Sequence, residues 1–251
     1  MRIALALVAL TLVMPAYGSA CRARSEPHTT ALVELYTSEG CSSCPPADQW
    51  LSALGQNRPV AEVVPLALHV DYWDYIGWKD PYAKREFSQR QRRLSQLQRA
   101  AFVYTPQVML QGRDFRAWGS SAFDQALARI NAQPARAAIE LEIVSASAEA
   151  FRLHVAASVS DRALAPQATL YVAAYENRLQ SLVSAGENLG RTLRHDHVAL
   201  EWQGPYPLGE REVVLPLLPR GKAADSGVVA FVQNRATAEV LQVVSLGFCT
   251  P

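Results

Sequence analysis

The stretch that decides the fold is "ALVELYTSEGCSSCPPADQWLSALG", residues 31–55. Its opening "ALVELYT" is aliphatic, β-branched and aromatic in character, and it predicts a short strand. The part from Pro45 predicts a helix, because proline is tolerated in a first helical turn, apolar residues recur on one face, and Gly55 is a stop signal. Cys41 and Cys44 therefore stand where a strand turns into a helix.

This C-x-x-C pair has three interpretations. In the first it is redox-active: the helix dipole stabilises a Cys41 thiolate, and Cys44 resolves a mixed disulfide. Pro45 and Pro46 each remove an N–H donor from the first turn, so a very low thiol pKa is not expected. In the second the pair is a disulfide that only staples the loop. In the third Cys41, Cys44 and His69 bind copper; a zinc clasp is disfavoured because a second pair is missing.

The first twenty residues, "MRIALALVALTLVMPAYGSA", have the pattern of a secretory signal. Arg2 precedes an apolar run, and small residues end the segment, so residues 1–20 are predicted to be cleaved off after Ala20. The protein is therefore expected in the periplasm or outside the cell. Lipidation of Cys21 is the alternative, but Gly18 stands where lipoprotein signals prefer a large aliphatic residue.

The cysteine count points to two disulfides. Four cysteines in an exported chain suggest pairing, because the compartment is oxidising. Cys41 with Cys44 is sterically natural, which leaves Cys21 and Cys249 as candidates for a structural bridge between the two ends of the chain.

Periodicity along the chain predicts two domains. Residues 61–70 form a continuous apolar run, typical of a strand covered on both faces. A helix is predicted over 82–100 and a hairpin over 106–119, followed by another helix, so residues 29–134 read β-α-β-α-β-β-α with a mixed sheet. Residues 135–251 hold about seven short strands between turn signals, which predicts an all-β antiparallel sandwich-like domain.

The chain resembles the exported bacterial thioredoxin-like family catalogued as domain of unknown function 1223. The resemblance is carried by "VELYTSEGCSSCPPADQWL" (33–51), "HVDYWDYIGWKDPY" (69–82), "VYTPQ" (103–107) and "GENLGRTLRHDHV" (186–198). It implies an α/β thioredoxin-like first domain. A thioredoxin-like fold further implies that Thr105–Pro106 is a cis bond beside the cysteines that orients a substrate segment. It also implies that Glu34 is a buried acid relaying protons to Cys44; a solvent-facing carboxylate is the alternative.

The aromatic connection at residues 71–81 has two interpretations. Tyr72 and Trp73 are candidates for a substrate platform beside the cysteines, or the cluster packs only on its own domain. Further on, His195 and His197 lie two apart, which places both on one face of a predicted strand. They begin a metal site or make ordinary hydrogen bonds; no third ligand is evident, so no metal and no cofactor are predicted.

The predicted function is an exported thiol–disulfide oxidoreductase with Cys41 as nucleophile and Cys44 as resolving thiol. Its expected partners are protein thiols or disulfides in the periplasm. The chain has 251 residues, 19% of them charged, and a net charge of +1. This balance gives no reason to expect nucleic acid or an anionic membrane as a partner, and no stable membrane span is predicted. The alternatives are a non-enzymatic binding protein with a structural Cys41–Cys44 disulfide and a copper-handling protein.

Overall fold

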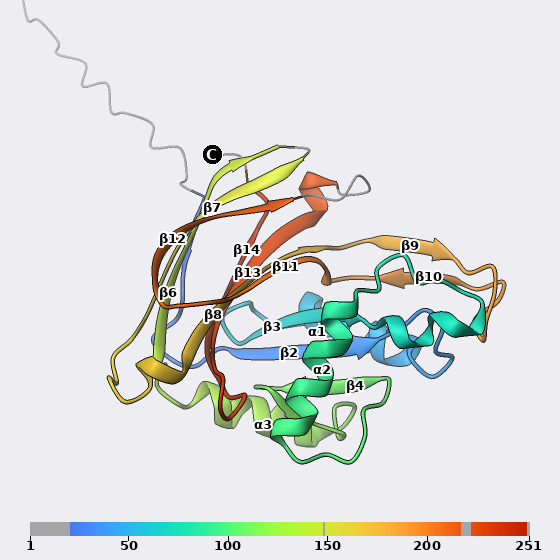
Figure 1. Cartoon of the computed structure of the whole chain (residues 1–251), viewed down its shortest axis with the longest axis horizontal. Helices are drawn as coiled ribbons and strands as arrows, with labels where there is room; N and C mark the ends of the chain where they lie inside the picture. The colour runs from blue at the N-terminus through green and yellow to red at the C-terminus, as the bar shows by residue number, and fades with distance from the viewer. Residues whose placement is uncertain (1–20, 148, 217–221, 250–251) are drawn as a thin grey trace, which may run out of the picture.

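An eight-stranded mixed sheet runs through the protein (Figure 1). The computed structural model describes residues 21–147, 149–216 and 222–249, so the predicted signal segment lies outside the described residues. The strands follow the order β14 (Val240–Gly247), β13 (Ser226–Asn234), β8 (Ala168–Glu176), β11 (Val198–Tyr206), β3 (Val63–His69), β2 (Ala31–Thr37), β4 (Gln107–Leu110) and β5 (Arg113–Asp114). The neighbours β11, β3 and β2 run parallel, and the other pairs are antiparallel.

The expected fold, an α/β thioredoxin-like domain followed by a sandwich, is wrong. The protein is mostly β: 43% of the described residues lie in strands and 22% in helices, and the large sheet joins strands from both sides of Pro134. The two halves share one sheet because β11 pairs with the edge of β3, through Val198 and Ala67. Local periodicity carries no information on a pairing between strands so far apart in the chain. The division into units 29–134 and 135–251 stays a prediction.

Helices cover both faces of the β2–β3–β4 part of the sheet. On one face, α1 (Pro45–Asn57) and α3 (Ser121–Asn131) pack on the inward side chains of β2. On the other, Phe87 and Leu94 of α2 (Arg85–Leu97) pack on Leu68 of β3. Because both faces are covered, β2 and β3 are buried along their whole length, in keeping with their largely apolar sequences. Short 3₁₀ turns complete the helical structure: η1 (Asp71–Ile76), η2 (Ala165–Gln167) and η3 (Ala223–Asp225).

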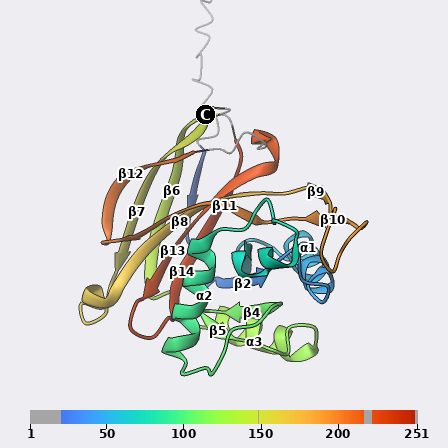
Figure 2. The same ribbon diagram turned by 45° about the vertical axis from the view of Figure 1, so that its right-hand side comes forward.

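A second, four-stranded antiparallel sheet packs on the β8–β13–β14 end of the large one (Figure 2). Its strands are β1 (Arg22–Arg24), β6 (Ala137–Ala146), β7 (Ala150–Val159) and β12 (Gly209–Pro216). Burial alternates along β6, which marks a sheet with one face in the core and one in solvent. A disulfide joins Cys21, just before β1, to Cys249, just after β14. Within the residues described, no helix is long and apolar enough to cross a membrane.

A buried ion pair ties α2 to the large sheet. Arg90 donates to both carboxylate oxygens of Glu34, at 2.6 and 3.0 Å, and Glu34 has no exposed surface. The guanidinium lies 4.8 to 5.2 Å from the ring centres of Tyr171, Trp202 and Phe231, which come from β8, β11 and β13. Since Glu34 lies on β2, this one side chain connects strands from both halves of the chain.

Replacing Glu34 with glutamine should therefore destabilise the fold strongly. The substitution leaves the Arg90 charge buried without its counter-charge, and breaking a buried pair in this way costs about 3–5 kcal/mol. Urea unfolding followed by circular dichroism measures the change. The matched control is Glu142→Gln, whose partner Arg22 is largely exposed, and which should change stability by less than about 1 kcal/mol. Equal effects of the two substitutions would contradict the assignment.

Candidate functional site

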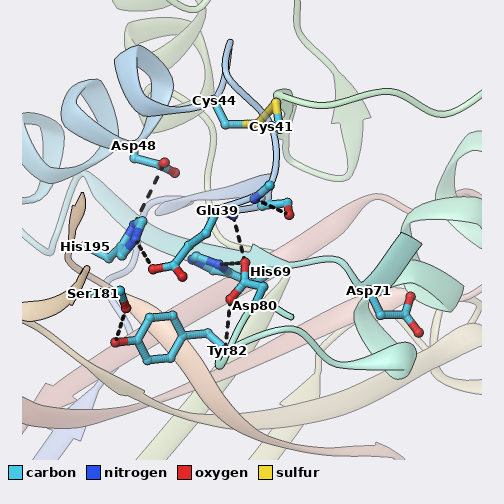
Figure 3. A network of polar contacts seen from close by, with 12 residues as sticks. Glu39, Cys41, Cys44, Asp48, His69, Asp71, Asp80, Tyr82, Ser181 and His195 are labelled. Atoms are coloured by element: carbon cyan, nitrogen blue, oxygen red, sulfur yellow. Dashed lines mark hydrogen bonds and ion pairs between the residues drawn. A yellow bond between two sulfur atoms is a disulfide. The ribbon is translucent and has the colours of Figure 1, made fainter. Parts of the chain in front are cut away.

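The cysteine turn connects β2 to α1 (Figure 3). Cys41 and Cys44 form a disulfide, and the Cys44 amide donates to the Cys41 carbonyl at 3.2 Å. Cys44 is the N-cap of α1, and two prolines follow it in the first turn. Cys41 is 1% exposed and Cys44 0%, whereas Ser42 and Ser43 are exposed. The turn thus presents its serines to solvent and its disulfide to the interior.

The side chain of Glu39 holds this turn in place from beneath. Glu39 is fully buried, its Oε1 lies 3.0 Å from Nε2 of His195, and its Oε2 accepts from the Trp78 indole at 2.9 Å. Its own amide donates to Asp80 Oδ2 at 2.8 Å, and its carbonyl accepts from Asn188 Nδ2 at 2.8 Å. The residue two places before Cys41 therefore contacts segments from far along the chain.

The loop between β9 (Leu179–Leu182) and β10 (Thr192–His195) completes the turn. Asn188, with no exposed surface, also donates to the Cys41 carbonyl at 3.0 Å, and its Oδ1 accepts from Arg191 at 2.8 Å. Glu187 accepts from the Ser42 amide at 2.9 Å, and hydrogen bonding to the side chain and the amide of Ser42 holds the pKa of this carboxyl below its usual value. The motif at residues 186–198 thus builds the cysteine turn from the second half of the chain.

A cluster of buried ionisable side chains lies under the disulfide (Figure 3). His69 Nδ1 lies 2.7 Å from Asp80 Oδ2, and the His69 and His195 rings are 4.9 Å apart. Asp48, one helical turn after Cys44, places its Oδ2 3.9 Å from His195 Nδ1. Groups of this kind are rarely buried unless they are paired or functional.

The charges in this cluster follow from burial and pairing. Burial alone would lower the pKa of His69, but the Asp80 carboxylate outweighs it and raises that pKa to about 8. Burial would raise the pKa of Asp80, and the His69 imidazolium instead lowers it. For Asp48, burial dominates and raises the pKa, against the opposing effect of His195. His69 and Asp80 thus form an ion pair, whereas burial favours the protonated form of Asp48.

Comparison with known proteins places the chain in a family. The model of the family described as "Protein of unknown function (DUF1223)" matches residues 32–233. The chain belongs to this family. The recognition from the four motifs is thereby confirmed.

The family assignment is accompanied by likeness to solved structures. The crystal structure of protein AGR_C_4864 from Agrobacterium tumefaciens is similar at 24% identity and a TM-score of 0.64, covering 90% of this chain and 97% of that one. HBP35 of Porphyromonas gingivalis is similar at 15% identity and a TM-score of 0.64, covering 89% and 76%. None of the curated proteins matches. At these identities the likeness shows a shared fold alone.

In this member of the DUF1223 family, Thr105–Pro106 and Trp73 lie close to the cysteine turn. The Thr105–Pro106 bond is cis. The Trp73 indole donates to Thr105 Oγ1 at 2.6 Å, and a Cβ added to Gly40 would meet the Trp73 Cβ at 3.2 Å. Trp73 therefore bridges the residue before Cys41 and the residue before the cis proline.

The structure places Tyr72 and Glu34 elsewhere. The Tyr72 hydroxyl donates to Gln91 of α2 at 3.0 Å, and burial raises its pKa to about 12. The Glu34 carboxylate forms an ion pair with Arg90 of α2. A relay through Glu34 would require that ion pair to break, and its role stays a prediction.

The histidine pair differs from the expectation. Strand β10 ends at His195, and His197 has a left-handed φ of 57°, so the two side chains do not share a strand face. His195 is buried against Glu39. The His197 ring is tilted by 42° against the Tyr175 ring, with the centres 5.7 Å apart, and burial lowers the pKa of His197 to about 4. Within residues 21–147, 149–216 and 222–249, no group of three His, Cys, Asp or Glu residues could hold a metal ion.

Sequence reasoning missed most of the buried cluster. The residues that it missed are Glu39, Asp48, Asp80 and Asn188, and all four lie within the quoted motifs; His69 and His195 have other roles in the interpretation from sequence. The signal in the sequence was the presence of three acidic residues, Glu39, Asp48 and Asp80, inside the motifs that carry the family resemblance. Their mutual contacts depend on chain segments more than one hundred residues apart, as between Glu39 and His195.

The His69–Asp80 pair predicts a particular pH dependence of stability. Because the folded pKa of His69 is about 8, above its ordinary 6.5, the protonated form is stabilised in the fold. This contribution is complete below pH 6.5 and is lost as the pH rises through 8, by up to about 2 kcal/mol. Urea unfolding of wild type and His69→Gln between pH 6 and 9 measures the difference. The control His197→Gln, at a site with a folded pKa of about 4, should keep the wild-type slope above about pH 7.5, where this histidine is unprotonated in both the folded and the unfolded chain; a His69→Gln slope equal to wild type in that range would contradict the pairing.

Proposed function

We propose that the protein is an exported thiol–disulfide oxidoreductase acting through Cys41 and Cys44. The observation that carries this proposal is the buried ionisable cluster directly beneath the disulfide, formed by Asp48, His69 and His195 with their partners. Removing charged groups from water costs several kcal/mol each. A disulfide that only staples a loop has no use for such groups, whereas breaking and forming thiols requires protons to be taken up and released.

The exchange reaction balances in two steps. A substrate thiolate attacks Cys41 Sγ, the Cys41–Cys44 bond breaks, and Cys44 leaves with the electron pair as a thiolate that takes up a proton. The second substrate thiol then loses its proton and attacks the substrate sulfur of the mixed disulfide, releasing Cys41. Two electrons pass from the substrate, which becomes a disulfide, to the protein, which becomes a dithiol. The reverse sequence reduces a substrate disulfide.

The surroundings of the turn suit this chemistry. The N-terminus of α1 favours negative charge on sulfur, although Pro45 and Pro46 leave few N–H groups to bind a thiolate. Trp73 and the cis Thr105–Pro106 bond lie beside the turn. They are the proposed contacts for an extended segment of a protein substrate, and Tyr72 is a more remote candidate. The proposed partners are protein thiols or disulfides, and the reaction needs no cofactor.

The presence of two disulfides supports an oxidising location. Such bonds persist in exported proteins and are rare in reducing compartments. Together with the predicted signal segment, residues 1–20, this supports the proposal that the protein works in the periplasm or outside the cell.

One observation favours a second candidate, a binding protein whose Cys41–Cys44 disulfide is structural. Both cysteines are almost completely buried, at 1% and 0% exposure. Thiol exchange requires an incoming sulfur to reach Cys41, so the turn would have to open for the reaction to occur.

A redox titration separates the two candidates. The protein is equilibrated in dithiothreitol buffers of stated potential, alkylated, and analysed by mass spectrometry of its peptides. A catalytic pair should have a reduction potential between about −120 and −270 mV and titrate reversibly there. A structural disulfide should have a reduction potential below about −300 mV and stay oxidised in all of these buffers. The Cys21–Cys249 bond serves as an internal control that should remain oxidised throughout. Titration of Cys41–Cys44 only below about −300 mV would refute the oxidoreductase proposal.

A further inference from the structure

Asp48 occupies a specific position relative to the resolving cysteine. Its amide donates to the Cys44 carbonyl at 3.1 Å, so the two residues are one helical turn apart, and side chains at this spacing lie on one face of a helix. Asp48 is only 6% exposed. In Figure 3 its carboxyl group lies between Cys44 and His195.

Two buried polar atoms meet at this point without hydrogen bonds. Asp48 Oδ1 and His195 Nδ1 both lack a hydrogen-bond partner among the described residues. His195 Nδ1 is nevertheless 3.9 Å from Asp48 Oδ2, and its Nε2 lies 3.0 Å from Glu39. Buried polar atoms are normally bonded, so an unbonded facing pair requires an explanation. A group that must alternately hold and release a proton provides one.

We propose that Asp48 exchanges the proton of the Cys44 thiol, and that His195, oriented by Glu39, adjusts the charge of Asp48. The inference rests on the proposed thiol–disulfide function. When the Cys41–Cys44 bond breaks, protonated Asp48 gives its proton to the departing Cys44 thiolate and becomes a carboxylate. In the reverse step the Asp48 carboxylate takes the proton of the Cys44 thiol, whose sulfur attacks the mixed disulfide at Cys41 and expels the substrate thiolate.

The groups around Asp48 support both protonation states. Burial raises its pKa, and Asp80 adds to this effect. His195 from β10, His69 from β3 and the Thr37 hydroxyl at the end of β2 favour its charged form. The Thr37 hydroxyl lowers the pKa of Asp48 although the two side chains are not within normal hydrogen-bond geometry. A carboxyl whose pKa is moved toward that of a thiol exchanges protons with it at a smaller penalty.

Glu34, the buried acid of β2, is unsuited to this role. Glu34 is held by two hydrogen bonds from Arg90, at 2.6 and 3.0 Å. Exchanging a proton with a thiol would require this bidentate pair to break. Asp48 combines burial, a free oxygen and the position one turn after Cys44.

The test uses the two-step reaction of the reduced protein with 5,5′-dithiobis(2-nitrobenzoate). The Cys41–Cys44 bond alone is reduced, as verified by peptide mapping, and release of thionitrobenzoate is followed by absorbance. Attack by Cys41 releases the first equivalent, and attack by Cys44 on the resulting mixed disulfide releases the second. In Asp48→Asn the first release should stay within about twofold of wild type. The second should slow at least about tenfold at pH 7 and recover above about pH 8.5, where a thiol ionises unaided.

Three further variants complete the design. Asp124→Asn is the matched control, because Asp124 also lies in the first turn of a helix but is exposed; both of its releases should equal wild type. Cys44→Ser should show only the first release. His195→Gln should move the half-maximum of the second release to higher pH, because His195 lowers the pKa of Asp48 and its removal raises that pKa.

The outcomes separate the two proposals. A second release that is unchanged in Asp48→Asn, or slowed equally at every pH, would overturn the proton-transfer role and leave the oxidoreductase function standing. An unshifted pH profile in His195→Gln would overturn the role of His195. If Asp48→Asn fails to fold, the same result would overturn the proposed proton transfer by Asp48. A wild-type first release no faster than that of free cysteine would refute the oxidoreductase function itself.

Discussion

The carboxylate of Glu39 is the constraint on which the cysteine site depends. It is buried, and its partners within the described part of the chain are His195 and Trp78 rather than a lysine or arginine. Through its backbone it also binds Asp80 and Asn188. A buried carboxylate is tolerated only when its oxygens are satisfied. The segments that carry these partners must therefore converge on the turn, which fixes the backbone just before Cys41.

The architecture of the large sheet brings those partners together. Pairing of Val198 with Ala67 inserts β11 beside β3, and the chain immediately before β11 then passes over the ends of β2 and β3. This passage delivers His195 to Glu39 and Asn188 to the Cys41 carbonyl. The second half of the chain thus supplies part of the site, in addition to packing on the first half. A separate sandwich domain would leave the cysteine turn without these contacts.

Prediction from sequence succeeded where the information is local. The strand-to-helix turn at Cys41 and Cys44 follows from residue types and proline positions in one short stretch. It failed where the outcome depends on distant pairing. A charged residue such as Glu34 in an apolar strand gives no hint that Arg90 and three aromatic rings surround it. Likewise, the spacing of His195 and His197 suggested one strand face, but the strand ends between them.

The local sequence was enough to define the cysteine turn, the family to which the chain belongs and the burial of strands β2 and β3. These properties depend on side-chain pattern and backbone preference within a few residues. Only the tertiary structure decided that one sheet unites both halves and that Asp48 and His195 meet beneath Cys44. Such contacts arise from burial and strand pairing across long stretches of chain, and the free energy of an ionisable group depends on those neighbours rather than on its own identity.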